Sequence, residues 1–312
     1  MDSDRKYEEA IRHLSEGEFD HARKAFDLLL ESDPENPDFA AGFYVSSYWD
    51  HRIDRIHHSR EGRDRAGLLL EFLKEFELIY AKKALPKSLA YLSAKDSVLK
   101  ESTDQLRIAL RKEGIQSLPA STISELAYRL LLAGETELAS EVLRDSSGLE
   151  RFSPELLFFR AECTYLSGNE SLGLLLYREA FLKDPSAVRL DCVKAEPIRR
   201  AIETLNDDFS DKNDLKEAIP VFCLETGIFR EIRKLGEKEI EQYRSELNRL
   251  KDSLALRKGS YELKIKCRMI QLCCALLDSR ASVYYAETAQ EAKRILDSLD
   301  PNFYQKRLGR TR

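Results

Sequence analysis

The sequence predicts an all-α protein: an α-solenoid of stacked antiparallel helical hairpins with a C-terminal helical hairpin or cap. Three observations predict this fold class. Turns are sparse, because only 13 Gly and 9 Pro interrupt 312 residues that are 43% hydrophobic and 34% charged. An Asp-Pro pair ends an amphipathic helical pattern three times, in "LESDPEN", "FLKDPSA" and "LDSLDPNF". Gly17 and Pro34 are 17 residues apart, as are Gly168 and Pro185.

The first hairpin is expected at residues 3–36. A helix over 4–15 is followed by a turn at Gly17, and a second helix is expected over 19–32. That second helix places apolar residues three or four positions apart, on one face of a 3.6-residue period: Phe19, Ala22, Phe26 and Leu29. Asp33-Pro34 then ends the hairpin.

Two further copies are expected at residues 120–152 and 153–187. Their turn glycines, Gly134 and Gly168, are 34 residues apart, which indicates a repeat of fixed length. Ser153 before Pro154 has the form of a helix N-cap, and Thr122 with Glu125 has the form of a capping box.

These copies resemble the tetratricopeptide-repeat family over residues 3–36 and 120–187. In that family small residues let paired helices approach closely, and a large apolar residue fills the gap against the next hairpin. The matching residues are Ala10, Ala127 and Ala161 in the first helix; Ala22, Ala139 and Gly173 early in the second; and Phe26, Leu143 and Tyr177 at the large position. The copies depart from the family where Lys6 and Ile123 occupy the usual aromatic position.

The chain is expected to divide into a helical-repeat array at 1–206, repeat-like C-terminal hairpins at 214–302 and a basic tail at 303–312. Elongated helices join the first and later copies, and Gly42 occupies the small position in the first of them. The acidic stretch 207–217 is the expected flexible connection. Apolar residues near heptad spacing over 228–256 predict a helical-hairpin cap or a short coiled-coil segment, and this 228–256 helix could also mediate self-association.

No catalytic, phosphate-binding or metal-binding motif is recognisable, so the sequence predicts a non-enzymatic protein with no cofactor and no metal. His51 and His58 share a helical face, but are separated by about 10 Å. All six cysteines lie in apolar helical pattern without Cys-x-x-Cys spacing, which predicts buried reduced thiols and favours a cytoplasmic location. An exported protein whose leader was removed is the alternative.

The resemblance implies a concave groove lined by the first helices. Its expected partner-binding residues are Tyr7, Ile11, Tyr128, Leu131, Phe158, Glu162 and Tyr165. Such an apolar, aromatic face would be covered by a protein or peptide segment, by an apolar ligand, or by the chain's own C-terminal helices. The favoured function is a scaffold or adaptor that holds a protein or peptide segment, of unknown identity, in this groove.

Two alternatives remain open at this stage. A cavity between the middle helices near Tyr44, Tyr48, Trp49 and Phe72 would make the protein a carrier of a small apolar ligand. Nucleic acid or another anionic surface could contact a basic patch, although the net charge of −5 disfavours a general polyanion binder. That patch consists of Arg52, Arg55, Arg60, Arg63 and Arg65.

Overall fold

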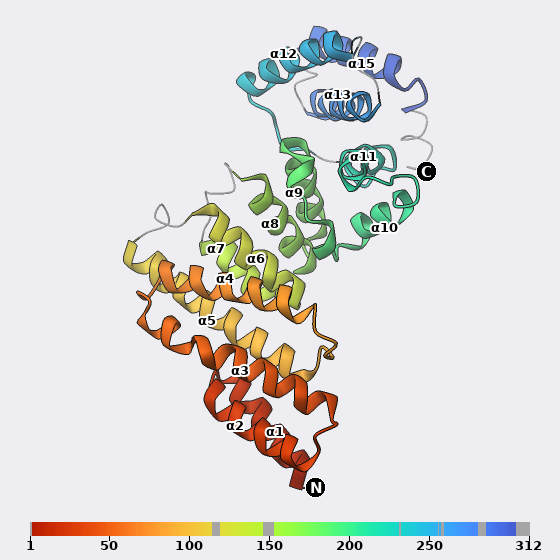
Figure 1. The fold of residues 1–312 in the computed structure, drawn as a ribbon. Coiled ribbons are helices and arrows are strands. Elements are labelled where there is room, and N and C mark those ends of the chain that lie inside the picture. The colour runs from red at the N-terminus through yellow and green to blue at the C-terminus, as the bar shows by residue number, and fades with distance from the viewer. Residues whose placement is uncertain are drawn as a thin grey trace. The chain divides into compact units, whose positions relative to one another are not determined.

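The computed structural model describes residues 2–113, 119–145, 153–230, 232–254, 256, 259–279 and 285–303. Over these ranges it contains 14 α-helices, two short 3₁₀ helices and no strand, so the predicted all-α class is confirmed (Figure 1). The chain divides into two compact units, residues 1–147 and 148–312, whereas the sequence suggested a division between 206 and 214. Each unit is described by itself below.

Unit 1 begins with the predicted hairpin. Its helices are α1 (Asp2–Ser15), α2 (Phe19–Ser32), α3 (Pro37–His58), α4 (Arg63–Tyr80), α5 (Leu89–Glu113), α6 (Ala120–Ala133) and α7 (Thr136–Asp145). Gly17 (φ 76°) makes the α1–α2 turn, and Gly134 (φ 90°) makes the α6–α7 turn. Glycine adopts this left-handed backbone without the steric cost of a Cβ atom, which explains both positions. The capping box at Thr122 is wrong, because α6 begins at Ala120 with Pro119 as its N-cap.

The α1–α2 hairpin is fixed to α3 by an aromatic ring packed on a glycine. A Cβ atom added to Gly42 would lie 2.1 Å from Cε1 of Phe26, so only glycine leaves room for this fully buried ring. Tyr7 meets the same ring edge-on, with the centroids 5.9 Å apart. The small position predicted at Gly42 and the large position predicted at Phe26 therefore meet across neighbouring hairpins.

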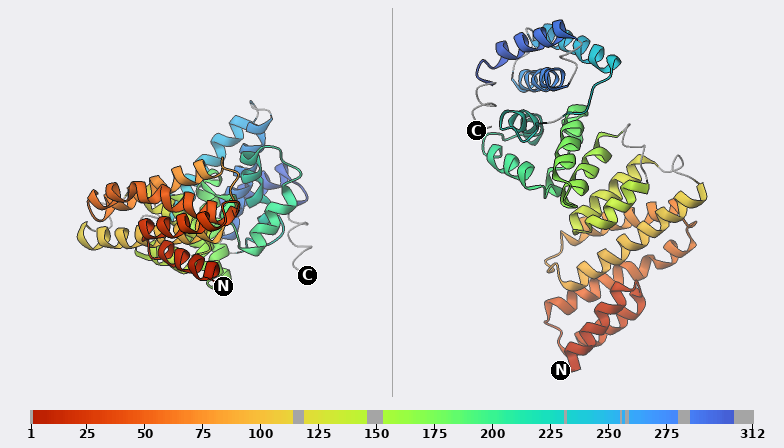
Figure 2. Two further views of the ribbon diagram at one scale, coloured as in Figure 1. Left: turned by 60° about the horizontal axis from the view of Figure 1, so that its bottom comes forward. Right: turned by 180° about the vertical axis from the view of Figure 1, so that it is seen from behind.

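Helix α5 organises the rest of unit 1. It packs antiparallel to α4, and it also contacts α1 and α3 (Figures 1 and 2). Its residue Tyr91 stacks with Phe76 of α4 at 5.5 Å, and Phe76 in turn lies 5.7 Å from Trp49 of α3. This aromatic cluster forms the core between the three long helices.

A partly buried charge cluster joins α4, α5 and α6. The Glu77 carboxylate receives Lys95 at 2.9 Å, and it also pairs with Arg129. Arg129 pairs again with Glu125 at 2.8 Å. Burial lowers the pKa of Lys95, the direction expected for an ammonium withdrawn from water. Glu77 therefore neutralises cations from two neighbouring helices.

Unit 2 begins with the third predicted hairpin. Its elements are α8 (Pro154–Leu166), α9 (Glu170–Lys183), η3 (Pro185–Ala187), η4 (Leu190–Cys192), α10 (Glu196–Leu205), α11 (Lys212–Glu225), α12 (Glu237–Leu254), α13 (Ser260–Asp278) and α15 (Ala286–Leu299). The predicted N-cap is confirmed, since the Ser153 hydroxyl accepts a hydrogen bond from the Leu156 N–H at 3.3 Å. A Cβ on Gly173 would lie 2.7 Å from Cβ of Tyr165, which explains the small residue there.

The second half of unit 2 is arranged around α13. In Figure 1 and in the right-hand view of Figure 2, which look along the axis of α13, α11 lies on one side of α13, and α12 and α15 lie on the other. Two predictions are corrected here. The acidic stretch 207–217 is not a flexible connection throughout, because Asp211 caps α11 by accepting from the Asn213 N–H at 2.8 Å. The helix predicted over 228–256 begins only at Glu237.

Burial of the cysteines agrees with the sequence. All six are buried and none forms a disulfide. Desolvation raises the pKa of the Cys163, Cys267 and Cys273 thiols to about 12, so these groups stay protonated near neutral pH.

The contact between Phe26 and Gly42 predicts opposite effects for two glycine substitutions. Gly42→Ala should lower the free energy of unfolding by about 2–3 kcal/mol, because the new methyl group collides with a buried ring. Gly67→Ala, in the second turn of α4, should raise it by about 0.5–1 kcal/mol, since no described atom outside the helix's own backbone lies within 4 Å of its Cβ. Urea unfolding followed by circular dichroism measures both. Equal effects at the two positions would contradict the packing described.

The charge cluster predicts a large cost for removing its shared carboxylate. Glu77→Gln should destabilise the protein by about 2–3 kcal/mol, because Lys95 and Arg129 then lose their common partner in a poorly solvated site. The matched control is Glu9→Gln, whose exposed pair with Arg12 at 3.9 Å should contribute less than about 1 kcal/mol. Chemical unfolding of the two variants measures both losses of unfolding free energy. Equal losses would contradict the role given to burial.

Candidate functional site

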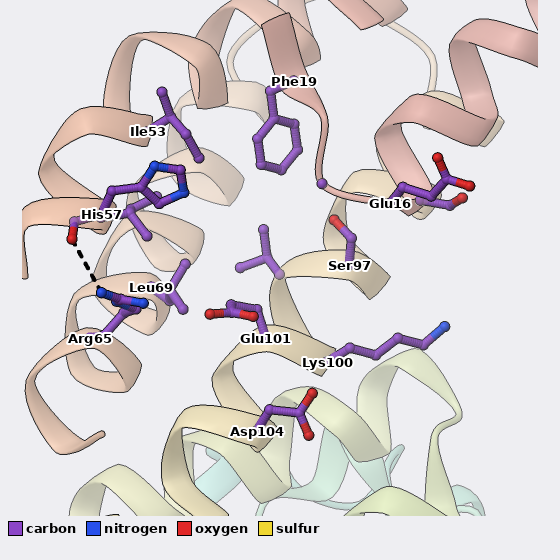
Figure 3. A pocket seen from close by; sticks show the side chains of 14 residues that line it. Glu16, Phe19, Ile53, His57, Arg65, Leu69, Ser97, Lys100, Glu101 and Asp104 are labelled. Carbon is purple, nitrogen blue, oxygen red and sulfur yellow. Dashed lines mark hydrogen bonds between the residues drawn. The ribbon is translucent and has the colours of Figure 1, made fainter. Parts of the chain in front are cut away.

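The cleft of unit 1 lies between the α1–α2 turn and helices α3, α4 and α5, and has a volume of about 350 Å³ (Figure 3). This is within the usual range for small-ligand sites. Fourteen residues line it: Ser15, Glu16, Gly17, Phe19, Ile53, Ile56, His57, Arg65, Leu69, Ser97, Val98, Lys100, Glu101 and Asp104.

The floor of the cleft is apolar. Phe19, Ile56, Leu69 and Val98 are buried core residues from four different helices, and Ile53 is half-buried beside them. They come together because the core face of each amphipathic helix continues into the cleft. The floor can therefore take an apolar side chain of a bound molecule.

One wall of the cleft is held by the segment between α3 and α4. Gly62 (φ 93°) donates its N–H to the Gln105 side-chain carbonyl of α5 at 2.7 Å. Arg65 donates to the carbonyls of His57 at 3.2 Å and Ser59 at 3.0 Å, the first drawn dashed in Figure 3. A guanidinium on the last carbonyls of α3 opposes the negative end of that helix. Arg65 is therefore a structural part of the wall.

Carboxylates outnumber cations around the cleft. Glu101 and Asp104 lie one turn apart on α5, and Glu16 lies at the α1–α2 turn. Lys100 and Arg65 are the cations among the lining residues, and Arg65 is directed to the carbonyls of the wall. The charge surplus favours a ligand that carries a positive group.

The predicted groove residues do not form one open surface. Tyr7, Ile11, Tyr128 and Tyr165 are only partly exposed, while Leu131, Phe158 and Glu162 are fully buried. Tyr7 packs on Phe26 and Phe39, and Phe158 packs on Phe159 and Tyr177. Buried members of this set cannot contact a partner without rearrangement.

The Glu162 side chain is covered by a later segment of the chain. Its Oε1 atom accepts hydrogen bonds from the N–H groups of Lys194 at 2.6 Å and Ala195 at 3.2 Å. The chain segment that follows η4 therefore covers this face of α8. Burial raises the pKa of Glu162 to about 7, although the two N–H groups act in the opposite direction. The sequence pattern predicted the small and large repeat positions, but no local pattern predicted that residues 194–195 would cover Glu162.

The basic patch is largely used within the fold. Arg52 stacks over the Tyr48 ring at 3.6 Å and pairs with Glu75 at 3.4 Å. Arg55 lies over the Phe72 ring at 4.9 Å, and Arg63 pairs with Asp64 at 3.5 Å. Arg65 binds the wall carbonyls, and among the described residues the Arg60 side chain has no such contact. Residues 304–312 of the basic tail lie outside the described residues.

The surroundings of Trp49 form a packed core. Its ring is fully buried, and lies 5.8 Å from Phe19, 5.3 Å from Tyr48 and 5.7 Å from Phe76. The Tyr48 hydroxyl donates to the Phe72 carbonyl at 2.9 Å. These side chains fill the space near Trp49 where the sequence suggested a site for a small apolar ligand.

A group of ligating side chains at the α1–α2 turn was missed by the sequence reasoning. His13, Glu16 and Glu18 each bring one potential metal-ligating atom to within 4.8 Å of the others. The signal was present as "HLSEGEFDH", residues 13–21, where histidines and glutamates are placed symmetrically about the turn glycine.

Comparisons with protein-family models, with curated proteins and with solved structures found no match for this chain. No helix in the described part of the chain is long and apolar enough to cross a membrane.

The raised pKa of Glu162 predicts a pH-dependent stability. The folded state keeps this proton up to about pH 7, whereas the unfolded chain releases it near its ordinary pKa of 4.5. The folded state binds more protons between these values, so stability falls as pH rises through the window. Replacing Glu162 by Gln, which cannot ionise, should remove this loss, with a limiting slope of about 1.4 kcal/mol per pH unit.

Urea unfolding of both proteins from about pH 5 to about pH 8 measures the difference. Glu170→Gln is the control, because Glu170 is exposed at the start of α9. Parallel curves for the wild type and Glu162→Gln would mean that Glu162 is ionised in the folded protein throughout.

Proposed function

We propose that this protein is a non-enzymatic scaffold with a tetratricopeptide-like solenoid arrangement, which binds a segment of another protein. The segment presents one apolar side chain next to a lysine or arginine. The observation that carries the proposal is the cleft of unit 1, with its apolar floor and its surplus of carboxylates.

The repeated hairpins support the scaffold part of the proposal. The pairs α1–α2, α6–α7 and α8–α9 share a left-handed turn glycine at the same position. Gly42 and Gly173 occupy small positions of the repeat pattern, and at each of them a neighbouring helix comes too close for a side chain. Stacked hairpins of this kind present side chains from several helices to a bound segment.

The cleft supports the choice of ligand. Phe19, Leu69 and Val98 lie at the floor, where a leucine-sized side chain would lose contact with water and gain about 1.5–3 kcal/mol. Asp104 at the edge is exposed and pairs with Arg107 at 3.1 Å, so a basic group can share or replace that exposed pair without desolvation of a buried charge. The charge match would act mainly on specificity and on the rate of association.

The other functions considered have weaker support. A small apolar ligand near Trp49 would have to displace packed rings. Contact with a polyanion through the basic patch would compete with the internal pairs of Arg52 and Arg65. Self-association through the C-terminal part of the chain remains a proposal, with α12 as its surface.

A displayed library of short random peptides tests the proposal on the full chain. Enriched sequences should combine a leucine, isoleucine or phenylalanine with a neighbouring lysine or arginine. Synthetic peptides with glutamate in place of the basic residue should bind at least about tenfold more weakly in fluorescence polarisation. Binding of the basic peptides should also weaken with added salt.

Two protein variants locate the binding site. Asp104→Lys should weaken the enriched peptides by roughly tenfold, because it places a like charge beside their basic group. Glu31→Lys is the matched control: it makes the same charge change on an exposed position of α2 that does not line the cleft. No enrichment, or equal affinities for the two variants, would refute the proposed function.

A further inference from the structure

The α1–α2 turn gathers two histidines and two glutamates from both sides of Gly17. His13 lies in the last turn of α1, and His21 lies in the first turn of α2. Their rings stack with centroids 5.4 Å apart. Glu16 and Glu18 flank the glycine between them.

Glu18 is the centre of this group. Its Oε2 atom lies 2.6 Å from Nδ1 of His13 and 3.9 Å from Nδ1 of His21. Its salt-bridge partners in the described part of the chain are these two histidines, and no lysine or arginine is among them. The two carboxylates of this group carry a negative charge that a divalent cation could balance.

The spacing of the ligating atoms suits one metal ion. Ligands about 2.0–2.1 Å from a tetrahedral ion are separated from one another by roughly 3.3 Å. The atoms offered by His13, Glu16 and Glu18 all lie within 4.8 Å of one another. An ion between His13 and Glu18 would lengthen their 2.6 Å contact by less than about 1 Å. The side chain of Glu18 is 45% exposed, so it can move that far without disturbing the core.

The type of ligand selects the metal. Imidazole nitrogens with carboxylate oxygens suit Zn²⁺ and neighbouring transition metals, whereas Mg²⁺ and Ca²⁺ prefer oxygen ligands alone. We infer that the α1–α2 turn binds one divalent transition-metal ion, Zn²⁺ or a close relative. His13, Glu16 and Glu18 are its ligands, and His21 lies outside this trio, with its Nδ1 3.9 Å from Glu18 Oε2. Because His13 lies in the last turn of α1 and Glu18 is the N-cap of α2, a bound ion joins the two helices.

The inference does not depend on peptide binding. His13, Glu18 and His21 are absent from the lining of the cleft, so they can be changed without altering its floor. Glu16 belongs to both sites and is left unchanged in the experiment.

The experiment titrates Zn²⁺ into the metal-free full chain by calorimetry, and Co²⁺ by visible absorption, which reports coordination geometry. The wild type should bind one ion per chain and unfold at a higher temperature when Zn²⁺ is present. His13→Gln and Glu18→Gln should each weaken Zn²⁺ binding at least about tenfold. Mg²⁺ should not compete at equal concentration.

His58→Gln is the control, because His58 is an exposed histidine in the last turn of α3 whose Nδ1 lies 2.7 Å from the Asp54 carbonyl. It should bind Zn²⁺ like the wild type. Thermal unfolding without metal verifies that all variants fold, since the side chains of His13 and Glu18 are 17% and 45% exposed. Absence of saturable Zn²⁺ binding overturns the inference. Wild-type affinity in both turn variants, or equally tight binding of Mg²⁺, overturns it as well.

Discussion

The contact between Phe26 and Gly42 is the constraint on which unit 1 depends. A ring that meets a helix backbone directly brings α2 closer to α3 than any residue with a Cβ would allow. That close approach sets where the α1–α2 turn lies, and Ser15, Glu16 and Gly17 of the turn reach the cleft. Helix α5 then packs against α1 and α3 and supplies the facing wall. The position of the cleft therefore depends on the contact between Phe26 and Gly42, two residues that do not line it.

Charged groups inside the fold have different environments and different consequences. Glu77 stands between Lys95 and Arg129, so its charge is balanced by side chains of two other helices. Glu162 accepts backbone N–H groups at Oε1, and within the described part of the chain its Oε2 has no hydrogen-bond partner. The second arrangement favours the protonated acid, as the raised pKa of Glu162 indicates.

The surfaces proposed for binding lie where packing is incomplete. The repeat resemblance directed attention to the first helices, yet Leu131 and Phe158 are buried and Glu162 is covered by the chain itself. The cleft and the α1–α2 turn instead adjoin each other at Glu16. Both also offer exposed carboxylates, Glu16 and Asp104 at the cleft and Glu18 at the turn, that can be changed without touching the buried floor.

The helical class, the turns at Gly17, Gly134 and Gly168, and the cap at Ser153 could all be predicted from the sequence, because they follow from local periodicity and backbone preference. Local signals failed at Thr122 and in 212–217, where the surrounding structure extends a helix through residues of weak preference. Only the tertiary structure decided which faces stay open. A helical period fixes which residues share a face, but the partner of that face is set by segments far away in the chain, such as α5 for α1 and residues 194–195 for Glu162.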